Sequence, residues 1–240
     1  MGGRRCGSRR GPAGSCARKG RAPVSSGDVA DLPFPLPAAL AGRLAAAADV
    51  EGKVARALEG LGPFAGRDVL LLDVPDGVLL RRLADSGARL AHGDLTSPLR
   101  IDRRARSLDV LVSLWTGFRG VDPVALAEVD RVLRPGGRLL VVHDYGRDDV
   151  SALRGPDAPE YGDWGRRDGP FLRGGGFKLH VLHCFWTFAD LDDARSFLAE
   201  AFGAAGETLG AGLKRPRVTW NVAVYHRWRN GVEPKAGPAG

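Results

Sequence analysis

Apolar residues in the first half of the chain alternate between helical spacing and continuous runs. One helical face is indicated by a spacing of 4, 4 and 3 residues, at Val50, Val54, Leu58 and Leu61. Residues 69–72 then form an uninterrupted apolar run, as in a strand that is buried on both faces of a parallel sheet. We therefore expect helices to precede the first core strand.

The same alternation continues to residue 143. Apolar residues recur at helical spacing from 78 to 84, and further strands are expected over 88–92, 108–114 and 139–143. Asp122 is expected to cap another helix, with Pro123 at its first position. Alternating strands and helices predict an α/β fold with a Rossmann-like, doubly wound and mostly parallel sheet.

The C-terminal part follows a different pattern. Two long β-rich segments, 177–188 and 217–227, flank a helix that Asp190 is expected to cap and Gly203 to end. Two late strands on an otherwise parallel sheet predict an antiparallel C-terminal edge. The segment 146–176 holds eight glycines and three prolines, which predicts a long loop or lid.

The positive charge of the chain is concentrated at its N-terminus. The formal net charge is +7, and residues 1–27 carry seven arginines and lysines and no acid, so the remaining residues sum to zero. A segment rich in Gly, Arg and Ser is typical of disorder. We expect a disordered basic tail over 1–30, one domain over 31–229 and a disordered tail over 230–240. A folded part without net charge argues against specific nucleic-acid binding.

Composition excludes several other classes of protein. No apolar run is long enough to span a membrane or to act as a secretory signal, which predicts a cytoplasmic protein with no membrane partner. Three cysteines without paired spacing support neither a disulfide framework nor a zinc site. His180, His183 and Cys184 are close in sequence, but residues 180 and 183 of a strand point to opposite faces, so no metal site is expected.

Four segments carry a family resemblance: residues 69–77, the Gly93-Asp94 pair, residues 108–114 and residues 131–142. Together they resemble the class I S-adenosylmethionine-dependent methyltransferases. The most specific feature is the leucine-arginine-proline-glycine-glycine turn at 133–137, which in that family leads from a helix into the fifth strand. The resemblance implies S-adenosylmethionine as the cofactor.

The resemblance also implies where the cofactor binds. In the family, the carboxyl ends of the first strands hold the cofactor, and an acid after the second strand accepts hydrogen bonds from the ribose hydroxyls. Asp94 stands 21 residues after Asp73, a spacing that suits this role. The implied cofactor-contacting residues are Asp73, Val74, Pro75, Gly77, Asp94, Leu95, Ser113 and Trp115.

Two features depart from the family pattern. Asp73 and Pro75 stand where the family has glycines, and a proline has no amide donor. Only 13 residues, 95–107, separate Asp94 from the next expected strand, which is too few for a full helix and strand. Either the second helix and third strand are missing, or an earlier unit is missing and Gly93-Asp94 corresponds to a later Gly-Asp motif of the family.

Polar and aromatic residues offer candidate chemistry. His143, Asp144 and Tyr145, at the end of an expected strand, supply a base, a carboxylate and a phenol for catalysis, and a structural role is the alternative. Four aromatic residues are candidates for a methyl-acceptor pocket, with core packing as the alternative: Trp164, Phe171, Phe185 and Trp186.

These observations favour an S-adenosylmethionine-dependent methyltransferase that acts on a small molecule or a protein. No Asn-Pro-Pro-Tyr or Asp-Pro-Pro-Tyr motif follows residues 108–114, which argues against the nucleic-acid amino-methylating enzymes of the family. A catalytically silent methyltransferase-like binding or scaffolding domain is the alternative. A nicotinamide-dependent oxidoreductase would need a Gly-x-Gly-x-x-Gly turn, which residues 73–77 lack.

Overall fold

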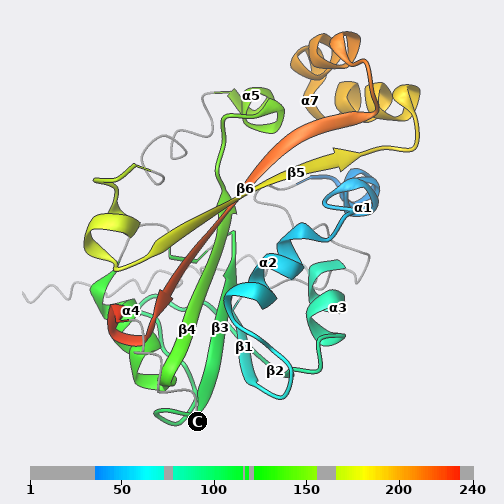
Figure 1. The fold of residues 1–240 in the computed structure, drawn as a ribbon. Helices are drawn as coiled ribbons and strands as arrows, with labels where there is room; N and C mark the ends of the chain where they lie inside the picture. Colours follow the sequence, from blue (N-terminus) through cyan, green and yellow to red (C-terminus); the bar gives the residue numbers. More distant parts are fainter. Residues whose placement is uncertain (1–35, 73–77, 116, 119–121, 156–165, 233–240) are drawn as a thin grey trace, which may run out of the picture.

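The fold comes from a computed structural model, which describes residues 36–72, 78–115, 117–118, 122–155 and 166–232 (Figure 1). Four of the residues expected to contact the cofactor, Asp73, Val74, Pro75 and Gly77, lie outside these ranges, as does the tail expected over 1–30. Of the tail expected over 230–240, residues 233–240 lie outside these ranges, whereas Asn230 and Gly231 belong to a 3-10 turn.

A six-stranded sheet forms the centre of the structure, in the order β2-β1-β3-β4-β6-β5. The strands are β1 (Asp68–Leu72), β2 (Arg89–Gly93), β3 (Leu108–Leu114), β4 (Leu133–Asp144), β5 (Lys178–Thr187) and β6 (Arg217–Trp228). The first four in space run parallel, β6 is antiparallel to β4, and β5 is antiparallel to β6. This confirms the predicted Rossmann-like, mostly parallel sheet with an antiparallel C-terminal edge.

Helices cover both faces of the sheet (Figure 1). They are α1 (Ala38–Ala47), α2 (Lys53–Leu61), α3 (Val78–Ala84), α4 (Pro123–Val132), α5 (Asp149–Arg154) and α7 (Leu191–Gly212), with a π-helical turn η2 (Pro170–Gly174) and a 3-10 turn η3 (Arg229–Gly231). α1, α2, α3, α5 and α7 pack on one face, and α4 and η2 pack on the other. Each face therefore has its own apolar core, and the side chains of a strand alternate between the two cores.

The helix signals near residues 50 and 122 have different outcomes. Asp122 caps α4 as expected, because its carboxylate accepts the backbone N–H of Val124 at 2.8 Å and Pro123 stands at the first helical position. The prediction that Val50 continues one helical face is wrong, since Val50 lies in a turn between α1 and α2 and is 46% exposed. The backbone of Asp49 and Gly52 is left-handed there, so the chain leaves the helical path.

The short stretch after β2 contains neither a helix nor a strand in the structure. β2 pairs directly with β1 and forms the edge of the sheet. Residues 94–107 instead run over α4, where the Arg131 guanidinium donates to the carbonyls of Ile101 and Arg103, both at 2.9 Å. β2 follows β1 in the chain and also lies beside it in the sheet, as the second strand of a doubly wound sheet does. This favours the alternative in which β2 is the second strand and the second helix and third strand are missing.

Glu128 of α4 holds this stretch by a charged contact, and we expect it to make stability depend on acid pH. Its carboxylate accepts from the Arg131 guanidinium at 2.8 Å and from the backbone N–H of Ile101 at 2.9 Å. These two partners, the guanidinium first, lower the pKa of Glu128 from 4.5 to about 2. Because the folded state favours the ionised form, this stabilisation is complete above pH 4.5 and is lost as the pH falls towards 2.

The expected measurement is urea unfolding of the wild type and of Glu128→Gln at a series of pH values. Between about pH 5 and pH 2 the wild type should lose about 1 to 3 kcal/mol more unfolding free energy than the variant. Subtracting the unfolding free energy of the variant from that of the wild type at each pH removes the contribution of the other carboxyl groups, which both proteins share. Parallel pH profiles would show that Glu128 does not hold the stretch by its charge.

The segment 146–176, expected to be a loop or lid, is structured at both ends. α5 begins with a capping box, in which the Asp148 side chain accepts the N–H of Ser151 at 2.7 Å. Phe171 of η2 is fully buried and stacks on Tyr225, with ring centroids 4.1 Å apart. These ends belong to the packed domain, and the lid prediction is limited to residues 156–165, which lie outside the described residues.

The late helix α7 begins and breaks at the residues that its sequence indicates. The Asp190 carboxylate accepts the N–H of Asp193 at 2.8 Å at the start of the helix. Gly203 has φ 55 and interrupts the helix, and a second helical segment then continues to Gly212. The prediction that Gly203 ends the helix is therefore confirmed for the first segment only.

Candidate functional site

The carboxyl ends of β2, β1 and β3 meet at one edge of the sheet. The strand registers place Leu72, Gly93 and Ser113 side by side in neighbouring strands. Asp94 follows Gly93 directly, and Trp115 follows two residues after Ser113. Because neighbouring strands are about 4.8 Å apart, Asp94 and Trp115 start from positions separated by about two strand spacings, or about 10 Å. Ligands of open α/β sheets bind at this type of edge.

Asp94 is exposed at the carboxyl end of β2. Within the described ranges, its carboxylate makes no hydrogen bond or ion pair with another residue. The next residue, Leu95, is half-buried and packs against the core on the α4 face. The Asp94 carboxylate is thus a hydrogen-bond acceptor whose position is fixed by the packing of the next residue, Leu95.

Ser113 and Gly117 make a tight contact beneath this edge. Ser113 is fully buried, and its Oγ has no hydrogen-bond partner within the described part of the chain. A Cβ added to Gly117 would lie 2.1 Å from Ser113 Oγ and 2.7 Å from Leu95 Cδ1, so only glycine fits there. Gly117 was not among the expected site residues, although a glycine just after a core strand is a signal of close backbone approach.

Trp115 forms the wall of a small cavity on the opposite face of the sheet. Its backbone is left-handed, with φ 58, and its indole lies 5.7 Å from that of Trp220, centroid to centroid. The cavity measures about 40 Å³, enough for a few water molecules or a small chemical group. Its lining residues come from α1 and the turn after it, from α2 and α3, from the residue after β3, and from β6: Ala45, Ala48, Asp49, Val54, Leu79, Arg82, Trp115 and Trp220.

Asp49 is the buried acid of this cavity, and it is already engaged. Its carboxylate accepts the backbone N–H groups of Lys53 and Val54, both at 2.9 Å, and so caps α2. The Arg82 guanidinium donates to the Asp49 carbonyl at 2.9 Å and lies 3.7 Å from the carboxylate. These contacts occupy the Asp49 carboxylate, which makes Asp49 a structural part of the wall.

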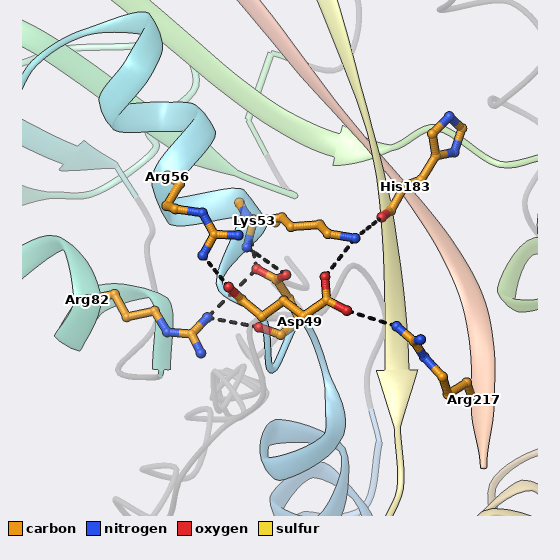
Figure 2. Close-up of polar contacts among 8 residues, drawn as sticks. Asp49, Lys53, Arg56, Arg82, His183 and Arg217 are labelled. Carbon is orange, nitrogen blue, oxygen red and sulfur yellow. Dashed lines mark hydrogen bonds and ion pairs between the residues drawn. The ribbon is translucent and has the colours of Figure 1, made fainter. Parts of the chain in front are cut away.

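Further contacts fasten the turn after Asp49 to the antiparallel edge, as Figure 2 shows. Lys53 Nζ donates to the His183 carbonyl of β5 at 2.8 Å. Glu51 pairs with Arg217 of β6 at 2.8 Å and with Lys53 at 2.8 Å, and these partners, Lys53 first, lower the pKa of Glu51. The cavity wall is thus held from α3, β5 and β6 together.

The three candidate catalytic residues do not form one cluster. His143 is buried on the α4 face, with its ring centroid 6.1 Å from Phe171 and 6.3 Å from Tyr225. Asp144 points to the other face, because successive residues of β4 alternate. Tyr145 is half-buried and packs with the core on the His143 face. A shared role of His143 and Asp144 at one reacting atom is not supported by this arrangement.

Asp144 holds an indole of the cavity in place. One carboxylate oxygen accepts Trp220 Nε1 at 2.9 Å, and the other accepts Arg154 at 2.8 Å. The Asp144 side chain is 5% exposed and the Arg154 side chain 18%. The position of the Trp220 ring is therefore fixed by a buried ion pair that joins β4, α5 and β6.

The expected acceptor pocket of four aromatic residues is not formed. Trp186 is fully buried on the α7 face, whereas Phe171 is fully buried on the α4 face, so the sheet separates them. Phe185 is half-buried on β5, and Trp164 lies outside the described residues. Trp115 and Trp220 are the aromatic residues that line the small cavity. The order of the strands in the sheet brings them together, and the spacing of residues in the sequence does not reveal that order.

The described part of the chain shows neither a metal-ligand cluster nor a membrane-spanning helix. No group of three or more histidines, cysteines and acids is placed to hold a metal within the described ranges. Burial raises the pKa of the Cys184 thiol to about 12, which keeps this residue in the form that does not bind metals. Among the helices of the described residues, none is long and apolar enough to cross a membrane.

Comparison with known proteins finds similarity among solved structures. No protein-family model and no curated protein matches the sequence. The structure is similar to a protein of Anaeromyxobacter dehalogenans provisionally classed as a type II methyltransferase, at 20% identity over 72% of this chain and 94% of that chain, with a TM-score of 0.45. It is also similar to a SAM-dependent methyltransferase from Aquifex aeolicus, at 15% identity over 74% of this chain and 93% of that chain, with a TM-score of 0.43.

A third similar structure is phosphoethanolamine N-methyltransferase 2 of Haemonchus contortus in complex with S-adenosyl-L-methionine. The identity is 17%, the match covers 76% of this chain and 52% of that chain, and the TM-score is 0.43. This chain thus spans about half the length of that enzyme.

Proposed function

We propose that this chain is an S-adenosylmethionine-dependent methyltransferase that binds the cofactor at the carboxyl edge of β1, β2 and β3. The observation that carries the proposal is the exposed Asp94 carboxylate after β2, two strand positions from a cavity lined by Trp115. The resemblance of residues 69–142 to class I methyltransferases supports the proposal, because it implies that Asp94 contacts the ribose and that Trp115 lines the cofactor.

The residues at this edge suit such a cofactor. The Asp94 oxygens are available to accept hydrogen bonds from two neighbouring hydroxyls, as a ribose presents them. Gly117 brings backbone close to Ser113 and Leu95 without a side chain in the way. Asp73 and Pro75 come between β1 and α3 in the sequence and lie outside the described residues, so the proposal rests on the Asp94 side of the edge.

The chemistry required of the chain is mainly positioning. The cofactor supplies a methyl group on a sulfonium, which is reactive without a metal. The protein must hold an acceptor in line with that methyl group and exclude water. Trp115 and Trp220 offer flat apolar surfaces for this, and the ion pair of Asp144 with Arg154 fixes the Trp220 ring. The acceptor is a small molecule or a protein side chain whose end group fits beside the two indoles.

Calorimetry of the full chain with S-adenosylmethionine and S-adenosylhomocysteine tests the proposal. We expect both to bind, and we expect Asp94→Ala to weaken binding about tenfold, since a hydrogen bond to a charged group contributes about 1 to 3 kcal/mol. Asp102→Ala is the matched control, because Asp102 is exposed in the same stretch after β2 and away from the edge. Its affinity should equal that of the wild type.

Two results would count against the proposal. The first is the absence of binding of either compound at millimolar concentration, which would leave a methyltransferase-like domain without the cofactor. The second is an Asp94→Ala affinity equal to that of Asp102→Ala, which would remove Asp94 from the site.

A further inference from the structure

Exposed arginines gather in the stretch between β2 and β3, on the part that runs over α4. Residues 100–106 hold four of them and a single acid, Asp102, and all five side chains are exposed. The arginines are Arg100, Arg103, Arg104 and Arg106. Four positive charges and one negative charge give this segment, the 100–106 patch, a local charge of +3, although residues 28–240 as a whole sum to zero.

The arginines of the 100–106 patch have no acidic partner in the described part of the chain. Three of the guanidinium groups form no hydrogen bond there, and the fourth donates only to the carbonyl of the preceding residue, at 3.0 Å. The acids of α4 are engaged by other arginines, since Glu128 pairs with Arg131 and Asp130 with Arg227, each at 2.8 Å. Arg100 adds only a small through-space attraction to Glu128, whose pKa is lowered first by Arg131. The local charge is therefore not neutralised within the described residues.

The backbone that carries these arginines is held firmly. The Arg131 guanidinium binds two carbonyls of the patch at 2.9 Å each, and the Arg131 carbonyl accepts the N–H of Arg106 at 2.9 Å. Ser107 Oγ donates to the carbonyl of Arg104 at 2.6 Å. The long side chains thus start from fixed points, which reduces the entropy that is lost when a partner orders them.

Arg106 has a backbone conformation that does not suit an arginine. Its backbone is left-handed, with φ 56, which favours glycine because a side chain crowds the following carbonyl. Its side chain is exposed and has no partner among the described residues, so the fold gains nothing from it. Folding alone would favour glycine at this position, and the arginine points to a use outside the fold.

We infer that the 100–106 patch binds the phosphate backbone of a nucleic-acid duplex, without regard to base sequence. A guanidinium forms two parallel hydrogen bonds with phosphate oxygens, which a lysine cannot do. Seven residues span at most about 25 Å, a length over which a duplex presents more than about ten phosphates. The inference goes beyond the proposed function and does not depend on it, because contact with a phosphate backbone requires no cofactor.

The residues around the arginines disfavour other anionic partners. A single strand is bound by stacking of its bases on aromatic rings, and a bilayer or a protein surface by burial of apolar side chains. The patch has no aromatic residue, its large apolar residue Ile101 is buried, and Ala105 is its only exposed apolar residue. Contacts with phosphate alone carry no base information, so the expectation against specific nucleic-acid binding stands.

Fluorescence anisotropy of a labelled DNA duplex of about 20 base pairs, titrated with the full chain at about 50 to 200 mM salt, tests the inference. The patch variant combines Arg100→Gln, Arg104→Gln and Arg106→Gln. We expect the slope of log affinity against log salt to fall by about 2 to 3 in magnitude, since each phosphate contact contributes about 0.9. At about 100 mM salt the affinity should fall about tenfold or more.

A matched variant removes the same charge elsewhere. It combines Arg167→Gln, Arg173→Gln and Arg215→Gln, three exposed arginines that form no ion pair within the described ranges. The basic residues 1–27 are present in every protein, so their contribution to binding cancels in the comparison. The slope of the matched variant should stay within about 0.5 of the wild-type slope.

Arg106→Gly separates binding from folding. We expect this variant to unfold thermally at an unchanged or higher temperature, because glycine suits φ 56. Its affinity for the duplex should nevertheless fall about twofold or more.

Two results would overturn the inference. The first is an equal salt slope for the patch variant and the matched variant. The second is that the patch variant alone loses binding to vesicles with about 30% phosphatidylserine while its duplex binding is unchanged, which would make the partner a membrane surface.

Discussion

Asp144→Ala is expected to lower the free energy of unfolding by about 3 kcal/mol, the size of loss seen when one partner of a buried ion pair is removed. The substitution leaves Arg154 and the Trp220 indole without the carboxylate that joins them. Because the Arg154 side chain is only 18% exposed, water replaces the lost contact poorly. Urea unfolding of the full chain measures the loss.

Two variants make the result specific to this ion pair. Asp192→Ala removes a carboxylate that is 95% exposed, and it should change stability by less than about 0.5 kcal/mol. Asp144→Ala combined with Arg154→Met removes both charges, and it should recover part of the loss. A loss below about 1 kcal/mol for Asp144→Ala alone would instead leave this carboxylate available for a role in catalysis.

Phe171→Ala is expected to have the largest effect on stability, about 3 to 5 kcal/mol, since it removes a fully buried ring and leaves a cavity. The ring stacks on Tyr225 at 4.1 Å and meets Phe177 edge to face at 5.1 Å. If the residue instead belonged to a movable lid, its removal would change stability little. Val124→Ala, at a position that is 52% exposed, is the control and should cost less than about 0.5 kcal/mol. Urea unfolding curves of the three proteins give the comparison.

The parallel part of the fold follows from local sequence signals. The apolar run at 69–72 becomes β1 because both faces of that strand are covered by helices, and an uninterrupted run is what such a position requires. Asp122 and Pro123 start α4 because capping and a fixed φ act within one turn of the chain. Signals that depend on a few neighbouring residues are therefore reliable in this chain.

The cavity wall could not be predicted in the same way. Asp49 and Arg82 stand 33 residues apart and come from different elements, so no spacing connects them. The Asp49 carboxylate caps α2 after the chain has turned, and this turn is what takes Val50 away from the expected helical face. The apolar spacing near residue 50 predicts a helix. It does not reveal the hydrogen bonds of Asp49 that accompany the turn between α1 and α2.

The polar residues at the end of β4 illustrate a second limit. His143 and Asp144 are adjacent, which suggests a shared site, but adjacent residues of a strand face opposite cores. The partners of Asp144 are 10 and 76 residues away, and only the strand order β4-β6 brings Trp220 to it. The contact between Asp144 and Trp220 could be predicted only by a reader who already knew that β4 and β6 are neighbours in the sheet.

The insertion of β6 between β4 and β5 has a consequence for the synthesis of the protein. β6 follows both β4 and β5 in the sequence, yet it is the strand that pairs with β4 and that carries β5. As the chain emerges from the ribosome, the apolar edge of β4 and the whole of β5 therefore remain unpaired until β6 has been made. During that interval both present unpaired backbone groups to other chains, so this is the stage at which the nascent protein is most exposed to aggregation.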